Sequence, residues 1–166
     1  MRDYDTRRSG LQQTSELVES ITHAGRLLAL VVSGRFREPG IHFFTPVDFS
    51  QQLAYMEHPA GKLIAPHVHN PVPREVQYTQ EVLFIRKGSL RVDFYDHHHC
   101  YLRSRILEAG DVILLIEGGH GFEVLQDVEM IEVKQGPYAG EQDKTRFEGI
   151  NRARVRLTPE MADGAE

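Results

Sequence analysis

The stretch APHVHNPVPREVQYTQEVLFIRKG, residues 65–88, decides how the rest of this sequence is interpreted. It places His67 and His69 one residue apart, followed by a proline-rich segment, Glu81 and an apolar run that ends at Gly88. In a β-strand, side chains two positions apart point the same way, so the two imidazoles would project together, about 7 Å apart. Two such imidazoles can chelate a divalent metal ion when further ligands arrive from other strands.

Short apolar segments with regular punctuation surround this stretch. After Gly25 comes LLALVVS, which is rich in β-branched residues and predicts a strand. Many short strands at such spacing predict an all-β sandwich or barrel. The candidate strands that follow LLALVVS are 41–45, 52–58, 62–69, 78–87, 89–95, 101–108, 111–116, 121–126 and 128–134.

Two local patterns give more specific expectations. In SELVESIT, residues 15–22, the apolar side chains stand at helical spacing and predict a short N-terminal helix. In SLRVDFY, residues 89–95, apolar residues alternate with Arg91, Asp93 and Tyr95. That alternation predicts a strand with one face on a core and the other face in solvent.

Composition and charge restrict the class of protein. The chain has 166 residues, enough for one domain, and its net charge of −5 argues against nucleic acid or an anionic membrane as a partner. Its single cysteine, Cys100, cannot form an internal disulfide. Residues 1–20 are charged throughout, unlike a secretory signal, and the longest apolar run, Leu27–Val32, is far shorter than a membrane span. We therefore expect a soluble, cytoplasmic protein.

Four residues form the candidate metal site. Glu81 begins the strongly apolar run after the two histidines, and His120 follows a Gly-Gly pair much later in the chain. With His67 and His69 they would supply three imidazoles and one carboxylate. Such a set leaves one or two coordination positions for water or substrate.

The spacing of glycines around these residues carries a family resemblance. Gly61 lies six residues before His67, Glu81 lies seven before Gly88, and a later apolar strand opens at Gly110 and ends in GGHGF. This arrangement resembles the two sequence motifs of the cupin superfamily, over about residues 61–124. The matching residues are Gly61, His67, His69, Glu81, Gly88, Gly110, Gly118 and His120.

The resemblance implies an all-β fold with a particular architecture. Cupins are double-stranded β-helices, small jelly-roll barrels whose interior holds a metal ion. We therefore expect an N-terminal extension over residues 1–25 with its short helix, a cupin barrel over 26–140 and a polar C-terminal tail over 141–166. Cupins also commonly pair through edge strands, so we expect a homodimer in which Leu27–Val32 crosses to the partner.

Glu75 is an alternative to Glu81 as the carboxylate ligand. Eleven residues separate His69 from Glu81, a longer spacer than is usual in the family, whereas only five separate His69 from Glu75. Glu75 lies in a proline-rich stretch without a glycine seven positions later, so Glu81 is favoured and Glu75 stays open. The prolines suggest a rigid loop at the barrel mouth, where Arg74, Glu75 and Gln77 could meet a ligand.

From this resemblance we expect a metalloenzyme that acts on a small polar metabolite, such as a sugar or an oxo or hydroxy acid. The resemblance covers sugar isomerases, epimerases and dioxygenases, so one Fe, Mn, Ni or Zn ion could support Lewis-acid isomerase or lyase chemistry, or oxygenation. One alternative is a non-catalytic small-molecule binding or sensor protein that uses the same pocket. Another is a structural role for the metal.

A second histidine cluster is interpreted differently. The run DHHHC, residues 96–100, sets three consecutive histidines beside Cys100. Three consecutive residues of an extended chain cannot all face one ion, so this run predicts the exposed tip of a hairpin.

Overall fold

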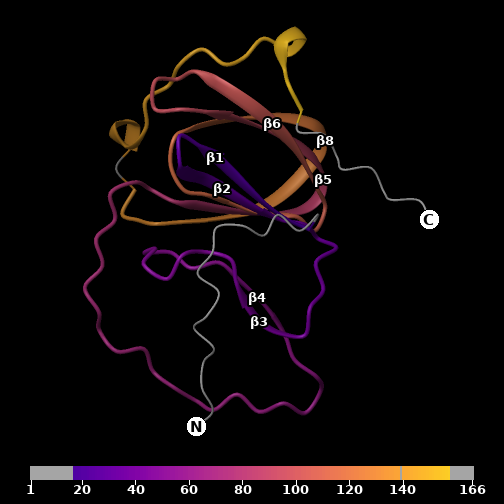
Figure 1. Ribbon diagram of the computed structural model, residues 1–166, viewed down its shortest axis with the longest axis vertical. Coiled ribbons are helices and arrows are strands. Elements are labelled where there is room, and N and C mark those ends of the chain that lie inside the picture. Colours follow the sequence, from indigo (N-terminus) through magenta and orange to yellow (C-terminus); the bar gives the residue numbers. More distant parts are fainter. Residues whose placement is uncertain (1–16, 139, 158–166) are drawn as a thin grey trace, which may run out of the picture.

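The computed structural model describes residues 17–138 and 140–157, which contain eight β-strands and two 3-10 helices. They form a curled half-barrel sheet with a small hairpin beneath it (Figure 1). The all-β prediction is confirmed. Residues 1–16 of the predicted N-terminal extension and residues 158–166 of the predicted C-terminal tail lie outside the described residues. Within the described part, no helix is long and apolar enough to cross a membrane.

The predicted N-terminal helix is wrong. Strand β1 (Val18–His23) forms an antiparallel hairpin with β2 (Arg26–Val32). Their turn, Ala24-Gly25, has positive φ at both residues, 48° and 76°, as a type I′ hairpin turn requires. This turn returns the chain onto the sheet, where Ile21 is fully buried. The packed sheet thus begins before residue 26, the predicted start of the barrel.

The main sheet has the order β1-β2-β7-β5-β6, with β8 paired to β5. Its longest strands, β5 (Glu81–Tyr95) and β8 (Gly119–Lys134), form one antiparallel ribbon. The first part of β5 pairs with β7 (Val112–Leu115) and the second part with β6 (Tyr101–Glu108). The predicted strands 78–87 and 89–95 are thus one continuous strand, as are 121–126 and 128–134.

On one edge of β5, the pairing partner changes from β7 before Gly88 to β6 after it. This residue has φ +75°, and a Cβ atom added to it would lie 2.0 Å from the carbonyl oxygen of Asp127 on β8. Only glycine therefore fits where the two strands of the ribbon approach so closely.

β2 lies between β1 and β7, so its backbone is paired on both sides. Its residues from Leu27 to Val32 are all buried. The expectation that Leu27–Val32 crosses to a partner subunit is therefore wrong, because both edges of this strand are paired within the chain.

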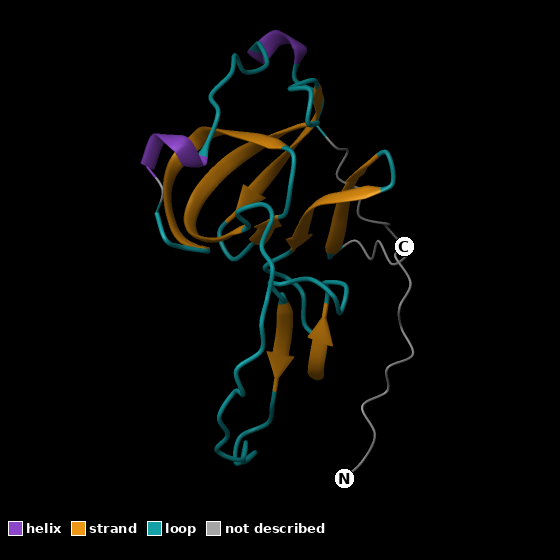
Figure 2. Cartoon of the chain, turned by 90° about the vertical axis from the view of Figure 1, so that its left-hand side faces the viewer, coloured by secondary structure: helices purple, strands orange, loops and turns teal. Residues whose placement is uncertain are grey.

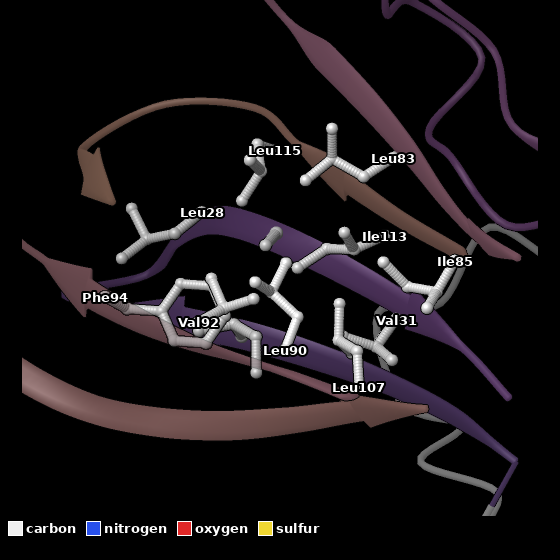
Figure 3. Close-up of a cluster of buried hydrophobic side chains, with 12 residues drawn as sticks. Leu28, Val31, Leu83, Ile85, Leu90, Val92, Phe94, Leu107, Ile113 and Leu115 are labelled. Atoms are coloured by element: carbon white, nitrogen blue, oxygen red, sulfur yellow. The ribbon is translucent and has the colours of Figure 1, made fainter. Parts of the chain in front are cut away.

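The core fills the concave side of the sheet (Figure 3). Leu90, Val92 and Phe94 of β5 are at most 1% exposed and meet side chains from the neighbouring strands. Burial of each such side chain stabilises the fold by about 1.5–3 kcal/mol. A smaller cluster, which includes Leu27 and Ile116, lies on the opposite face, where Phe49 and its neighbours cover it.

The second face of residues 89–95 is buried rather than in solvent, contrary to the sequence prediction. Arg91 and Asp93 are 8% and 6% exposed and form an ion pair with a 2.8 Å contact. The segment predicted as a polar tail covers this region, with 3-10 helices at Gly140–Asp143 and Arg152–Arg154. The Oη of Tyr95 accepts a hydrogen bond from the backbone amide of Ile150 at 2.9 Å.

The remaining strands and a long connection lie beside the curled sheet. Strands β3 (Gly40–Phe43) and β4 (Ala54–Glu57) form a separate two-stranded sheet. The connection from β4 to β5 extends away from the half barrel, past this hairpin (Figures 1 and 2). The strand predicted at 62–69 is absent. Every residue from 61 to 79, a segment we call the arm, is exposed.

Candidate functional site

Glu81 and His120 meet on the concave side of the half barrel. The Oε2 atom of Glu81 lies 3.2 Å from Nε2 of His120, and the two side chains are 12% and 30% exposed. Within the β5–β8 ribbon, however, Glu81 pairs with Lys134 and His120 pairs with Phe94. The two residues thus stand at opposite ends of one ribbon, and its curl brings their side chains together.

The strand register explains why both side chains point inward. Glu81 shares the face of β5 that carries Leu83 and Ile85, which belong to the concave core. His120 lies directly opposite Phe94, another core residue, and its ring lies 5.2 Å from that of Phe122. Both strands therefore contribute a polar side chain at the margin of the apolar core.

Basic neighbours keep the Glu81 carboxylate ionised. The hydrogen bond from His120 lowers the pKa of Glu81, and this effect, with the charges of His120 and Lys134, outweighs burial. The Nζ of Lys134 lies 3.7 Å from Glu81 Oε1 and 3.5 Å from Glu132 Oε1. Glu132 first, and then Glu81, raise the pKa of Lys134. A negative carboxylate and a positive amino group therefore stand side by side.

His67 and His69 form a second pair, on the arm. Their rings lie 5.2 Å apart in an edge-on arrangement, and both residues are exposed. Nδ1 of His67 lies 3.0 Å from the carbonyl oxygen of Ala65. Donation from Nδ1 to that carbonyl leaves the Nε2 lone pair free, which is the arrangement that metal-binding histidines use.

The structure does not bring the two pairs together. Within residues 17–138 and 140–157, no group of three or more His, Cys, Asp or Glu side chains is placed to hold one metal ion. The arm, which contains both histidines, extends away from the half barrel (Figure 2). The four predicted ligands thus lie in two separate pairs, one on the arm and one on the concave sheet.

Glu75, the alternative carboxylate ligand, and the other predicted substrate-binding residues, Arg74 and Gln77, lie at two clefts. Arg74 and Glu75 line a cleft of ≈ 830 Å³ beside residues 47–52. Glu75 and Gln77 line a second cleft of ≈ 320 Å³, which also includes Arg26. Leu27 and Ile116 of the outer apolar cluster border this second cleft. These clefts therefore lie on the outer face of the sheet, opposite the Glu81–His120 pair.

One charged pair at the second cleft was not anticipated. Nε of Arg26 donates to Glu117 Oε1 at 2.7 Å, and His97 Nε2 lies 3.7 Å from the same carboxylate. Arg26 and Glu117 are far apart in sequence and meet because β2 neighbours β7, so no local motif marks them.

The histidine run at 96–100 forms the turn between β5 and β6, as predicted. The Asp96 carboxylate accepts hydrogen bonds from the backbone amides of His98 and Cys100, both at 2.8 Å. This network explains the run structurally, as a capped hairpin turn.

Comparisons of the chain with models of protein families, with curated proteins and with solved structures give no match.

Proposed function

We propose that the protein is a mononuclear divalent-metal protein of the cupin type that acts on a small polar metabolite. The observation that supports this most directly is the 3.2 Å contact between Glu81 and His120 on the concave sheet. These two of the four predicted ligands are far apart in sequence, yet their side chains lie in contact because the β5–β8 ribbon is curled. The proposal includes the double-stranded β-helix, of which the half barrel would be a part.

The donor types fit the metal ions in question. A carboxylate oxygen and imidazole nitrogens are the ligands of Fe, Mn, Ni and Zn sites. His67 and His69 would complete the set once the arm meets the concave face. When bound, such an ion would polarise a carbonyl or hydroxyl oxygen as a Lewis acid or, if it is iron, support oxygenation.

The chain itself would bind and orient the metabolite beside this site. The Lys134 ammonium, 25% exposed, can pair with a carboxylate of an oxo or hydroxy acid. Phe122 and Val124 of β8 lie on the same face as His120 and remain 42% and 56% exposed. They offer apolar surface that would exclude water from the bound molecule.

One observation favours a second candidate, a binding or sensor protein. The two clefts beside Arg74, Glu75 and Gln77 include neither Glu81 nor His120. A ligand could therefore bind the outer face without reaching the candidate metal site. Saturable binding of a metabolite without turnover would identify this role.

Metal analysis of the untagged protein, purified without added metal, tests the proposal. We expect about one equivalent per chain in the wild type and little in His67→Ala/His69→Ala, because the arm supplies half of the ligands. The matched control, His58→Ala/His98→Ala, also removes two histidines and should retain the metal. An empty wild type after reloading with Fe, Mn, Ni and Zn would contradict the proposal, as would loss of metal in the control alone.

A further inference from the structure

The free edge of β8 and the arm carry complementary features. Within the described residues β8 pairs with β5 only, so its other edge presents unpaired backbone groups. A long, partly apolar edge strand is a surface on which another segment can add as a strand. Apolar side chains on β8 are also uncovered: Phe122, Val124, Leu125, Met130, Ile131 and Val133.

The arm has exposed apolar side chains of its own. Leu63 is 90% exposed, Val68 is 85% and Ile64 is 64%. Leu63 and Ile64 precede the two histidines and Val68 lies between them, in a segment that four prolines between 59 and 73 keep extended. Among the described residues, the arm's side chains up to Arg74 hydrogen-bond only within the arm. The arm thus presents apolar and metal-binding groups to something outside its own barrel.

Charge favours the same pairing. Residues 119–134 of β8 contain four acidic side chains and one basic, a net charge of −3. Residues 61–79 contain two basic side chains and one acidic, a net charge of +1, beside the two histidines. An arm laid along β8 would therefore meet a surface of opposite charge.

The anchoring of the arm points to a second copy rather than its own barrel. Glu75, Gln77 and Tyr78 line a cleft on the outer face of the sheet, and the Tyr78 ring lies 5.7 Å from that of His97. The arm extends away from the half barrel, past the β3–β4 hairpin (Figure 2). An arm from another copy can approach the concave face directly.

We propose that two copies exchange arms, so that His67 and His69 of each chain join Glu81 and His120 of the other. The proposal rests on the proposed metal site and adds that each site is built from two chains. A two-fold exchange buries both arms in the same way, which gives a closed homodimer. The dimer interface would be β8 and the arm, not the expected Leu27–Val32 strand.

A complementation experiment tests this assembly. His67→Ala/His69→Ala and His120→Ala chains are co-expressed with different affinity tags, and the heterodimer is isolated and loaded with Zn(II) or Mn(II). Exchange leaves one intact site in each heterodimer, so we expect about half of the wild-type metal per chain, while each variant alone binds little. A heterodimer that binds none while the wild type binds would overturn the exchange and leave the metal site standing. A wild type that binds no metal would overturn both.

A second measurement does not depend on metal. In a Cys100→Ser background, Val68→Cys is combined with Val124→Cys and the protein is oxidised. Exchange predicts a disulfide-linked dimer on a non-reducing gel, in excess of that formed by either single cysteine variant. A cross-link within one chain, or none, would overturn the exchange.

Discussion

Glu81 opens strand β5 and His120 lies near the start of β8, yet their side chains meet at 3.2 Å across the curl of the ribbon that these strands form. In a flat antiparallel ribbon the two residues would stand about 40 Å apart, because twelve or more residues of strand separate their pairing positions. The contact is therefore a property of the curvature, and it makes the candidate site sensitive to whatever bends β5 and β8.

Gly88 should be essential for that curvature. Gly88→Ala would place a Cβ atom 2.0 Å from the Asp127 carbonyl oxygen and would strain a positive φ. We expect a loss of about 3 kcal/mol or more in the free energy of unfolding, measured with denaturant. Gly25→Ala is the matched control: its φ is +76°, but nothing lies within 4 Å of the added Cβ. A loss there of about 1 kcal/mol is expected, and equal losses at both positions would refute the close-approach argument.

The buried face of residues 89–95 supports a second prediction. Asp93 accepts hydrogen bonds from Arg91 and Ser104. Asp93→Ala would leave the Arg91 charge nearly buried with only Glu123 to pair with it, so we expect a loss of about 3 kcal/mol in denaturant unfolding. Arg146→Ala breaks an exposed ion pair with Glu141 and should cost less than about 1 kcal/mol. If Asp93→Ala left the free energy of unfolding unchanged, this network would contribute little to stability.

The same face shows how far the sequence could predict the fold. Alternation in residues 89–95 correctly identified a strand and its apolar core face, because those patterns are local. It could not show that a later segment covers Arg91, Asp93 and Tyr95, since that contact depends on where the chain returns after residue 140. The helix prediction for residues 15–22 failed in a similar way. Helical spacing describes only the segment itself, whereas the type I′ turn at Ala24-Gly25 pairs this segment with β2 as a strand.

The candidate site was predictable only in part. Residue types and spacing selected Glu81 and His120, which the structure places together. They also selected His67 and His69, but the strand expected at 62–69 is an exposed segment that contains Pro66 and is followed by Pro71 and Pro73. Proline removes a backbone donor, so this segment cannot pair as an ordinary central strand. Lys134 joins the pair only through the register of the ribbon, which sequence alone does not specify.

The packing of the C-terminal segment against the sheet should depend on Tyr95. Its hydroxyl oxygen accepts from the Ile150 amide at 2.9 Å, and its ring packs edge-on against Phe147 with centroids 5.0 Å apart. Tyr95→Phe removes only the hydrogen bond, so we expect faster hydrogen exchange at the Ile150 amide with the fold intact. Tyr138→Phe, at a residue 74% exposed, should leave that exchange rate unchanged. Unchanged protection in Tyr95→Phe would contradict this docking.

Glu81 should contribute stability in a pH-dependent way. Its pKa is lowered in the folded protein, chiefly by the hydrogen bond from His120. The contribution is therefore fully present above the ordinary pKa of a glutamate and is lost as pH falls through the lowered folded value. We expect the difference in unfolding free energy between the wild type and Glu81→Gln to shrink over that acid range. Glu148→Gln, an exposed carboxylate, serves as the control. A difference that stays constant or grows toward low pH would contradict the pairing.

The most direct test of the central claim is the response of individual histidines to metal. Long-range ¹H–¹⁵N spectra of the labelled protein, titrated with Zn(II) and assigned with single histidine variants, report which ring nitrogens become ligands. We predict that His67, His69 and His120 shift together and saturate at about one equivalent, and that Glu81→Gln weakens the response. If these three imidazoles stay unchanged while those of the 96–100 turn respond, the metal site proposed on Glu81 and His120 is wrong.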